Sequence, residues 1–341
     1  MTDNERKHKA QGWKGLELAR AYFEEVGYPM LKQQFPQYMD RASAGLVGEG
    51  SECFGFDDEI SRDHDFGARF CIWLPDDLYR DIGERMQQAY EHLALDFHGY
   101  PVLSEPAAGG AKRSGVFSVG GFYGGLLGGG TLPQKEEDWF GFRESALAAA
   151  TNGAVFYDSG GAFSEIRETL KAYYPENVRK KKLAVNLMYM AQTGQVNYAR
   201  SIRRGELFTA DLCINEFIRA AISSLYLLNR RYMPYYKWAK AGLADAEVFP
   251  EGVDMLEQLQ SLGQQTSAWQ DIGADPQIIN KQDEKVLCIE AFCQRIAEEL
   301  RKQRLSDSPE VFLTQQALQV HGRITNREIL WRPLRMPEMN P

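Results

Sequence analysis

The stretch GEGSECFGFDDEISRDHDFG, residues 48–67, gathers acidic side chains between glycines. Carboxylates that lie close together repel one another, so this concentration indicates that a positive charge is held nearby. The end of this stretch continues as DFGARFCIWLP (65–75), in which Phe66, Ala68, Phe70 and Ile72 are apolar at every second position and Pro75 ends the run. Alternation with a period of two is typical of a β-strand. We therefore expect the acidic stretch to lead directly into a strand.

Asp63 and Asp65 are the candidate metal ligands of this stretch. On an extended chain their side chains project to the same face, while His64 points away. A hard cation with oxygen ligands, such as Mg²⁺, relieves the repulsion between two such carboxylates. Gly50 and Ser51 precede the pair by eleven intervening residues, and they can supply backbone N–H groups with a hydroxyl for phosphate oxygens. Together the two features predict a site for Mg²⁺ and a nucleoside triphosphate, with ATP as the default.

The other polar residues of the stretch have weaker claims. Asp57, Asp58 and Glu59 are interpreted as a solvated loop or local caps rather than as metal ligands. Arg62 is a candidate cofactor-binding residue, because its guanidinium can neutralise carboxylates or reach a phosphate. A calcium loop is the less favoured alternative, since the D-x-[DN]-x-[DN]-G register is incomplete.

This part of the sequence resembles the signature of the DNA polymerase β-type nucleotidyltransferase superfamily: Gly50-Ser51, eleven residues, Asp63-His64-Asp65 and then an apolar strand. The superfamily includes the small aminoglycoside and lincosamide nucleotidyltransferases of bacteria. The longer strings GEGSECFGFDDEISRDHDFG, VFYDSGGAFSEIR and LLNRRYMPYYKW are similar to an uncharacterised bacterial family placed in that superfamily. The resemblance implies that Asp63 and Asp65 are catalytic metal ligands and that Ser51 contacts the triphosphate. It implies transfer of a nucleotidyl group to a hydroxyl, with release of pyrophosphate.

Members of this superfamily often add a third carboxylate from a later strand, which binds metal or acts as the base for the acceptor. The corresponding candidate strand, GVFSVGGFY, contains no acid. Glu105 precedes it, and Asp158 ends a more distant strand. From the sequence, the third carboxylate is Glu105, Asp158 or absent.

The fold class predicted is α+β, with two domains, because 341 residues exceed the size at which one core stops growing. Residues 1–174 are expected to form the nucleotidyltransferase fold, a mixed sheet flanked by helices, and residues 175–341 an all-helical domain. In the first, we expect helices over 13–26 and 76–95, a break at GYPM (27–30), and a strand that ends at Asp158 before another helix. The glycine-dense stretch 115–142 is expected to mix a short strand with loops, and it lacks GxGxxG or GxxxxGK[ST] spacing.

Basic and aromatic side chains gather in NYARSIRRGELF and LLNRRYMPYYKWAKAGL, near predicted helix ends. Arg204 and Lys237 are the preferred candidates for contact with the triphosphate, although long basic side chains usually coat solvated surfaces. The run RKKK at 179–182 is interpreted as a solvated helix face. His321 is interpreted as structural rather than catalytic.

The formal net charge of −8 argues against nucleic acid as a partner, because phosphate-rich partners need a positive footprint. Five scattered cysteines form no CxxC pair, and no stretch has a signal core or a membrane span. We expect a soluble cytoplasmic enzyme whose partners are a nucleoside triphosphate and a small-molecule acceptor. The alternative, motivated by the missing third carboxylate, is a nucleotide-binding regulatory or toxin–antitoxin-like module with little or no catalysis.

Overall fold

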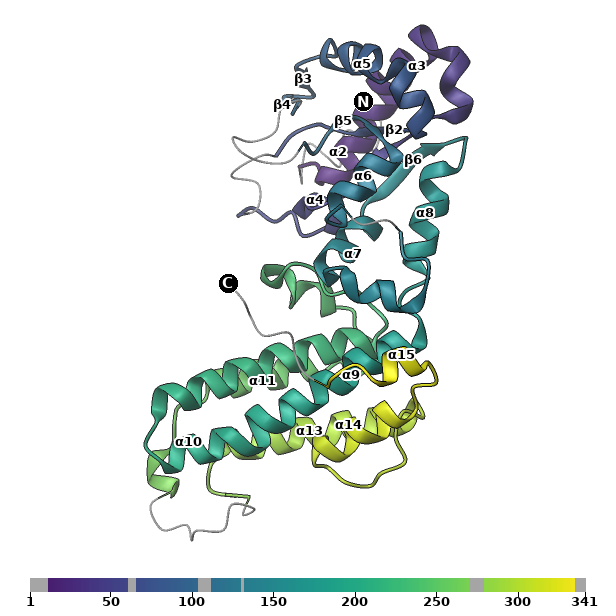
Figure 1. Cartoon of the computed structure of the whole chain (residues 1–341). Coiled ribbons are helices and arrows are strands. Elements are labelled where there is room, and N and C mark those ends of the chain that lie inside the picture. The colour runs from purple at the N-terminus through teal and green to yellow at the C-terminus, as the bar shows by residue number, and fades with distance from the viewer. Residues whose placement is uncertain (1–11, 61–65, 104–111, 130–131, 270–278, 335–341) are drawn as a thin grey trace. The chain divides into compact units, whose positions relative to one another are not determined.

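The computed structural model describes residues 12–60, 66–103, 112–129, 132–269 and 279–334 (Figure 1). Two compact units divide the chain: Met1–Leu132 with Gly141–Tyr173, and Pro133–Phe140 with Tyr174–Pro341. The first contains a mixed sheet flanked by helices, and the described part of the second is helical. The predicted α+β class is confirmed. Among the described residues, no helix combines the length and apolar content needed to cross a bilayer.

The first unit is built on a four-stranded sheet of order β5-β2-β1-β6. Its strands are β1 (Ser43–Leu46), β2 (Cys71–Leu74), β5 (Gly115–Ser118) and β6 (Ala154–Asp158). Strand β1 is antiparallel to both β2 and β6, whereas β5 is parallel to β2. The end of β1 and the beginnings of β2, β5 and β6 therefore lie at one edge of the sheet. The opposite edge holds the start of β1 and the end of β6.

Strand β2 is buried on both faces. Ile72 and Leu74 belong to the hydrophobic core that includes apolar residues of α2 (Gly15–Tyr22) and α5 (Asp76–Glu91). Trp73 points to the other face and stacks on Phe163 of α8 (Ala162–Lys171), with ring centroids 3.7 Å apart. Helices thus cover both faces of the sheet, and the run CIWL is apolar at every position as a doubly covered strand requires. Smaller elements of this unit are η2 (Pro36–Arg41), α4 (Ser51–Phe54), β3 (Asp96–Phe97), β4 (Tyr100–Pro101) and α7 (Glu144–Thr151).

The N-terminal helix is longer than expected. After α2 the chain makes a π-helical turn, η1 (Phe23–Gly27), and continues as α3 (Tyr28–Gln34). The predicted break at 27–30 is wrong, because the helix continues through a π-helical turn into α3, which has Pro29 in its first turn. Gly27 is needed for packing instead, since a Cβ there would collide with the ring of Phe70.

The glycine-dense stretch forms the expected short strand, β5, but its next eight residues are helical rather than a loop. This helix is α6 (Val119–Leu126), with the sequence VGGFYGGL. Glycine inside a helix costs about 1 kcal/mol relative to alanine, so propensity opposes the helix. The Ser118 hydroxyl caps it by accepting from the Gly121 N–H at 3.0 Å, and the buried ring of Tyr123 anchors it. Capping and burial outweigh the local preference.

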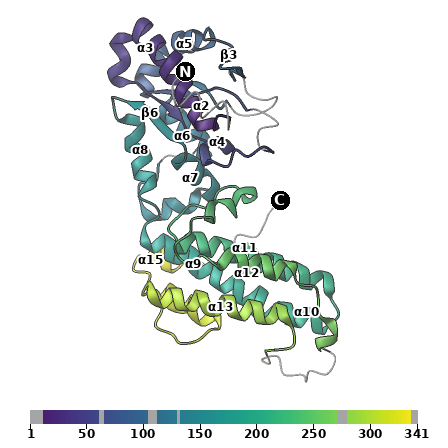
Figure 2. The same ribbon diagram turned by 180° about the vertical axis from the view of Figure 1, so that it is seen from behind.

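The second unit is a bundle around α9 (Glu176–Met190). Helix α9 continues through the π-helix η4 (Ala191–Tyr198) into α10 (Ala199–Arg203), and α11 (Leu207–Leu228) packs along it. The predicted stripe Ile214, Phe217, Ala221, Leu225 and Leu228 is buried on α11. The remaining elements are η5 (Tyr236–Trp238), η6 (Ala241–Leu243), α12 (Gly252–Ser261), η7 (Thr266–Trp269), α13 (Glu284–Lys302), α14 (Leu313–Gly322) and α15 (Arg327–Leu330). Figure 2 shows α12 beside α11 and α13.

A short piece of chain between two parts of the first unit belongs to this bundle. Segment Pro133–Phe140 contains most of η3 (Glu136–Gly141) and clusters with the second unit. The Glu136 carboxylate accepts from the Asn177 amide at 3.0 Å and from the Asn326 amide at 2.9 Å. The Trp139 ring meets Tyr174 edge-on, with centroids 5.6 Å apart. The chain therefore passes between the units three times.

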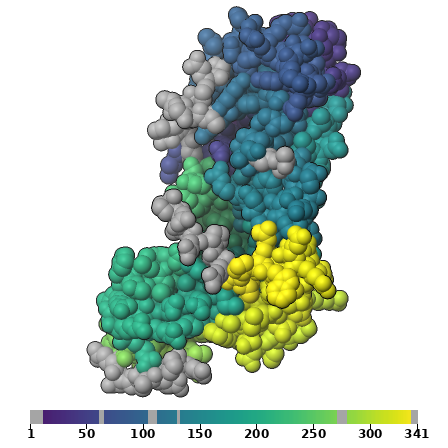
Figure 3. Space-filling view, viewed as in Figure 1, coloured from purple at the N-terminus to yellow at the C-terminus, as the bar shows by residue number. Residues whose placement is uncertain are grey.

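The C-terminal segment, yellow at the surface in Figure 3, is tied to α9 by a buried lysine. The Lys181 ammonium donates to the carbonyl oxygens of Leu330, at 3.2 Å, and Arg332. It also lies 3.1 Å from Nε2 of His321 on α14. Arg179 and Lys181 are each only 2% exposed, so the interpretation of 179–182 as a solvated face is wrong for both. Tertiary hydrogen bonds to carbonyl groups make their burial possible.

Burial, with a smaller contribution from Lys181, lowers the pKa of His321. The unfolded chain therefore binds more protons than the folded one below about pH 6.5. The contribution of His321 to stability is present above that pH and is lost as the pH falls through the lower pKa of the folded state. We expect the free energy of unfolding to fall less between pH 7.5 and 5.5 in His321→Gln than in the wild type, measured by urea denaturation. His92→Gln, which changes an exposed histidine of the first unit, should keep the wild-type pH dependence. An unchanged slope in His321→Gln would contradict this account.

Candidate functional site

The candidate site begins where β1 leaves the sheet, in the turn formed by residues 48–51. Gly48 has a φ of +139°, which favours glycine, and a Cβ on Gly50 would collide with the carboxylate of Glu52. The Asn152 amide pairs with the backbone of Gly48, accepting from its N–H at 3.0 Å and donating to its carbonyl at 2.6 Å. Ser51 follows as the first residue of α4. Asn152 therefore holds the 48–51 turn in place from the residue pair that precedes β6.

Gly153 holds the other side of the same turn. Its N–H donates to the carbonyl of Cys53 in α4 at 2.7 Å, and its φ is +61°. A Cβ at this position would collide with the carbonyl oxygen of Leu46. Neither Asn152 nor Gly153 was singled out in the sequence. The dipeptide Asn-Gly is a signal for a tight turn, but it does not say which distant segment the turn supports.

A buried ion pair lies under the 48–51 turn. Glu52 on α4 and Arg69, two residues before β2, are 9% and 6% exposed. The carboxylate Oε1 of Glu52 accepts from both Nη2 and Nε of Arg69, the latter at 3.1 Å. The pair connects the turn at the end of β1 to the chain that enters β2. Because its charge is neutralised by Arg69, Glu52 is a structural carboxylate and not a candidate metal ligand.

A small pocket of about 50 Å³ opens beside the turn. Cationic Lys112 and Arg113, just before β5, line it together with residues 48–50 and the Glu52–Arg69 pair. The Lys112 ammonium donates to Gln87 at 2.8 Å and to the Val116 carbonyl at 3.1 Å, and burial lowers its pKa. A liquid water molecule occupies about 30 Å³, so the pocket fits one polar group of a ligand. Two carboxylates, Glu49 and Glu52, line it as well, and Glu52 is paired with Arg69, so Lys112 and Arg113 are the groups that can bind an anion there.

The predicted metal ligands Asp63 and Asp65, with Arg62 and Glu105, lie outside the described residues. Asp57 is buried, and its Oδ2 accepts from the N–H of Gly15, the first residue of α2, at 2.7 Å. Asp57 is therefore neither a solvated loop residue nor a local cap, because its carboxylate is buried and binds the start of a helix 42 residues earlier. Within the described ranges, no three His, Cys, Asp or Glu side chains gather as a metal site.

Asp158 is removed as a candidate third carboxylate. It pairs in register with Ser43 at the start of β1, which is the edge of the sheet opposite the 48–51 turn. Its Oδ1 accepts from the Ser43 hydroxyl at 2.7 Å and the Gly161 N–H at 2.8 Å, and its Oδ2 accepts from the Ser164 N–H at 3.0 Å. Asp158 thus organises the turn into α8.

Arg204 and Lys237 are not brought together within the helical unit. Arg204 is exposed at the end of α10, before α11 begins. Lys237 is exposed in η5, which follows the other end of α11, and its ammonium lies 4.4 Å from the ring centroid of Trp238. Helix α11 has 22 residues, which at 1.5 Å per residue gives a length of about 33 Å. One triphosphate therefore cannot contact both side chains.

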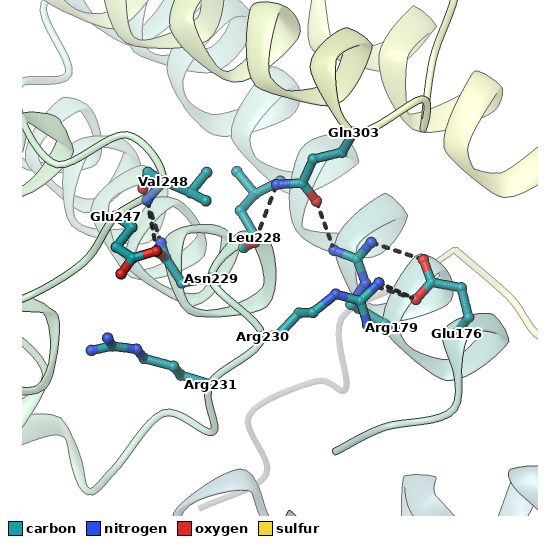
Figure 4. Close-up of a pocket in the computed structure, with 9 residues that line it drawn as sticks. All are labelled: Glu176, Arg179, Leu228, Asn229, Arg230, Arg231, Glu247, Val248 and Gln303. Carbon is teal, nitrogen blue, oxygen red and sulfur yellow. Dashed lines mark hydrogen bonds and ion pairs between the residues drawn. The ribbon is translucent and has the colours of Figure 1, made fainter. Parts of the chain in front are cut away.

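Arg230 and Arg231, from the stretch that contains Lys237, surround a polar pocket of about 550 Å³ together with Arg179, at the start of α9 and the end of α11 (Figure 4). Arg179 donates to Glu176 at 2.8 Å, to the Leu227 carbonyl and to Gln303. Arg230, at a φ of +52°, reaches the same Glu176 at 2.9 Å. These contacts join three helices, and the two arginines share one carboxylate whose pKa they lower despite its partial burial. The cluster explains the basic residues structurally.

Comparison with known proteins adds two findings. Residues 139–239 match the model of a family described as a domain of unknown function, DUF4037, over less than a third of the chain. A solved structure of a nucleotidyltransferase-like protein from Exiguobacterium sibiricum 255-15 is similar at 10% sequence identity, over 87% of this chain and 88% of that one, with a TM-score of 0.34. No curated protein matches the chain. The family match begins after the 48–51 turn and does not include it.

The buried pair yields a prediction about stability. Replacing Glu52 by Ala leaves Arg69 buried without a counter-charge, which typically costs about 3–5 kcal/mol of the free energy of unfolding. Urea denaturation of the full chain should show this loss in the transition of the first unit. Glu84→Ala, at an exposed site on α5, should change stability by about 0.5 kcal/mol or less. The double variant Glu52→Leu with Arg69→Met should be more stable than Glu52→Ala alone, and the reverse order would refute the role of the pair.

Proposed function

We propose that the protein is a Mg²⁺-dependent nucleotidyltransferase that transfers AMP from ATP to a hydroxyl of a small molecule. The observation that carries the proposal is the topology of the sheet. Because β1 is antiparallel to β2 and β5 is parallel to β2, the 48–51 turn, the chain entering β2 and the cations before β5 belong to one edge. Asp63 and Asp65 precede β2 along that chain.

The residues at this edge divide the work of binding a triphosphate. The backbone of the 48–51 turn, the Ser51 hydroxyl and the cations Lys112 and Arg113 are proposed to bind phosphate oxygens. Asp63 and Asp65 are proposed to hold Mg²⁺, which when bound neutralises phosphate charge and polarises the reacting phosphoryl group. Glu52 and Arg69 position the turn relative to β2 and take no part in binding.

The net charge of the chain supports a small molecule as the acceptor. A net charge of −8 opposes a long polyanion such as tRNA or DNA, whose binding depends on neutralising many phosphates. A compact acceptor with one reactive hydroxyl needs no such footprint. ATP is proposed as the default donor.

A second function is favoured by one observation. Glu52 is bound to Arg69, and Asp158 lies at the far edge, so neither of these two acids supplies the third carboxylate. A protein that holds Mg²⁺ and a triphosphate but lacks this acid is a binding module with little turnover. Such a module fits a regulatory or toxin–antitoxin-like role.

Turnover separates the two functions. The full chain is incubated with Mg²⁺, one labelled triphosphate at a time and a metabolite extract, and pyrophosphate is measured. For the enzyme we expect release that requires Mg²⁺ and falls by about 10²–10³-fold in Asp63→Asn and in Asp65→Asn, since each removes charge stabilisation of the reacting phosphates. Asp81→Asn, an exposed carboxylate on α5, is the charge-matched control and should keep full activity. Pyrophosphate release that survives without Mg²⁺, or in both Asn variants, would refute a reaction that depends on Mg²⁺ held by Asp63 and Asp65.

Binding tests the site itself under either function. Isothermal titration with ATP and Mg²⁺ should show that Lys112→Gln weakens binding by about tenfold, the effect of losing one charge-assisted hydrogen bond. Lys32→Gln on α3 is the matched control and should bind as the wild type does. Binding without pyrophosphate release would support the regulatory module. Metal-dependent binding that is intact in Asp63→Asn and Asp65→Asn would remove the site from both proposals.

A further inference from the structure

The helical unit contains a second cavity, of about 720 Å³. Residues of η4, α10, η7, α13 and the segment 309–312 line it. Apolar walls come from Trp269, Ile279, Val286, Ile289 and Phe312. A cavity of this size that is mostly apolar and has few polar groups is typical of a small-molecule site.

One wall of this cavity is fixed by a buried aspartate. Asp283 is fully buried and accepts from the Trp269 indole N–H at 2.7 Å and from the Tyr198 hydroxyl at 3.1 Å. It also caps α13 by accepting from the Lys285 N–H at 2.8 Å. The indole plane and the start of α13 are therefore held in place, and a ligand would meet a preformed surface. A preformed surface lowers the entropy cost of binding.

The carboxyl group of Glu290 is one of the polar features of the cavity, beside Gln195, Arg200, Asn280 and Glu310. Its Oε2 accepts from the Gln195 amide at 3.0 Å, and the Gln195 carbonyl oxygen accepts from the Leu313 N–H at 2.9 Å. Gln195 lies in the π-helix η4, and π-helical turns occur often at functional sites. With both ends engaged, Gln195 fixes the Glu290 carboxyl while leaving its Oε1 free of any hydrogen bond from the described residues.

Glu290 also lacks a counter-charge in the described part of the chain. Burial raises its pKa, only the hydrogen bond from Gln195 opposes that rise, and no cation contributes. Arg200 and Glu310 line the cavity as well, so carboxylates outnumber cations there. The thiol of Cys293, on the same helix, also feels the charge of Glu290. An ionised carboxyl group in an apolar wall is stabilised most by a cation.

We propose that this cavity, the Glu290 cavity, binds a small molecule that carries a protonated amine on an apolar, ring-sized body. The amine donates to the Glu290 carboxylate, and the body packs against Trp269 and Phe312. A neutral molecule of the same shape gains the apolar contacts alone, and an anion is repelled. The site lies wholly within the second unit and does not depend on the proposed nucleotide chemistry.

Three probes of matched size test the charge preference. Isothermal titration of the full chain at pH 7.5, without nucleotide or metal, compares 2-phenylethylamine, 2-phenylethanol and 3-phenylpropionate. The amine is expected to bind about ten- to a hundredfold tighter than the alcohol, the effect of one charge-assisted hydrogen bond, and the carboxylate is expected to bind least. An amine that binds no tighter than the alcohol overturns the proposal.

Variants locate the binding within the cavity. Glu290→Gln keeps the shape and should remove the preference for the amine, while Glu298→Gln, two turns later on α13, should keep it. Ala199→Phe fills the cavity and should abolish binding of both amine and alcohol, which keeps the proposal testable should Glu290→Gln fail to fold. Amine affinity in the wild type should also fall as acid protonates Glu290, beginning at a higher pH than for an exposed glutamate, whereas alcohol affinity should not change. Binding of the amine that is intact in both Glu290→Gln and Ala199→Phe refutes the site.

Discussion

The hydrogen-bond ladder of β2 is the constraint on which the first unit depends. This strand pairs with β1, antiparallel, along one side and with β5, parallel, along the other. Its side chains fill both faces of the sheet. Trp73 stacks on Phe163, while Ile72 and Leu74 lie in the core with α2 and α5. Because the register is fixed from two sides, the turn after β1 and the cations before β5 are held at the same edge. The site is thus a consequence of strand direction.

Periodicity in the sequence predicted the elements whose burial follows one local pattern. The apolar alternation after Asp65 indicated β2, and the three- and four-residue spacing indicated α5 and α11. Patterns failed where a distant contact decides the conformation. Gly27 lies within a continuous helix, where the ring of Phe70 leaves no room for a Cβ, and α6 forms from glycine-rich sequence with Tyr123 buried. The run at 179–182 resembles a solvated face, but carbonyl groups far along the chain accept from Lys181.

The candidate site was predictable to a similar degree. Gly50 and Ser51 lie in a turn, as glycine and serine together indicate, but the strand β1 before them was not predicted. Two distant groups hold this turn. Asn152 binds Gly48 from 104 residues later in the chain, and Arg69 binds Glu52 from 17 residues later. Nothing local to a residue announces such partners. The position of Asp158 was also not predictable from the sequence, because only the strand order shows that it lies at the far edge.

Segment Pro133–Phe140 carries a consequence for how this architecture can be divided. Since it belongs to the helical bundle but is bounded on both sides by chain of the first unit, neither unit corresponds to one continuous stretch of gene. A fragment that begins after Tyr173 would lack Glu136 and Trp139, which contact Asn177 and Tyr174. A single crossover cannot then transfer the bundle without part of the first unit, and during synthesis on the ribosome Glu136 of η3 emerges before its partners Asn177 and Asn326.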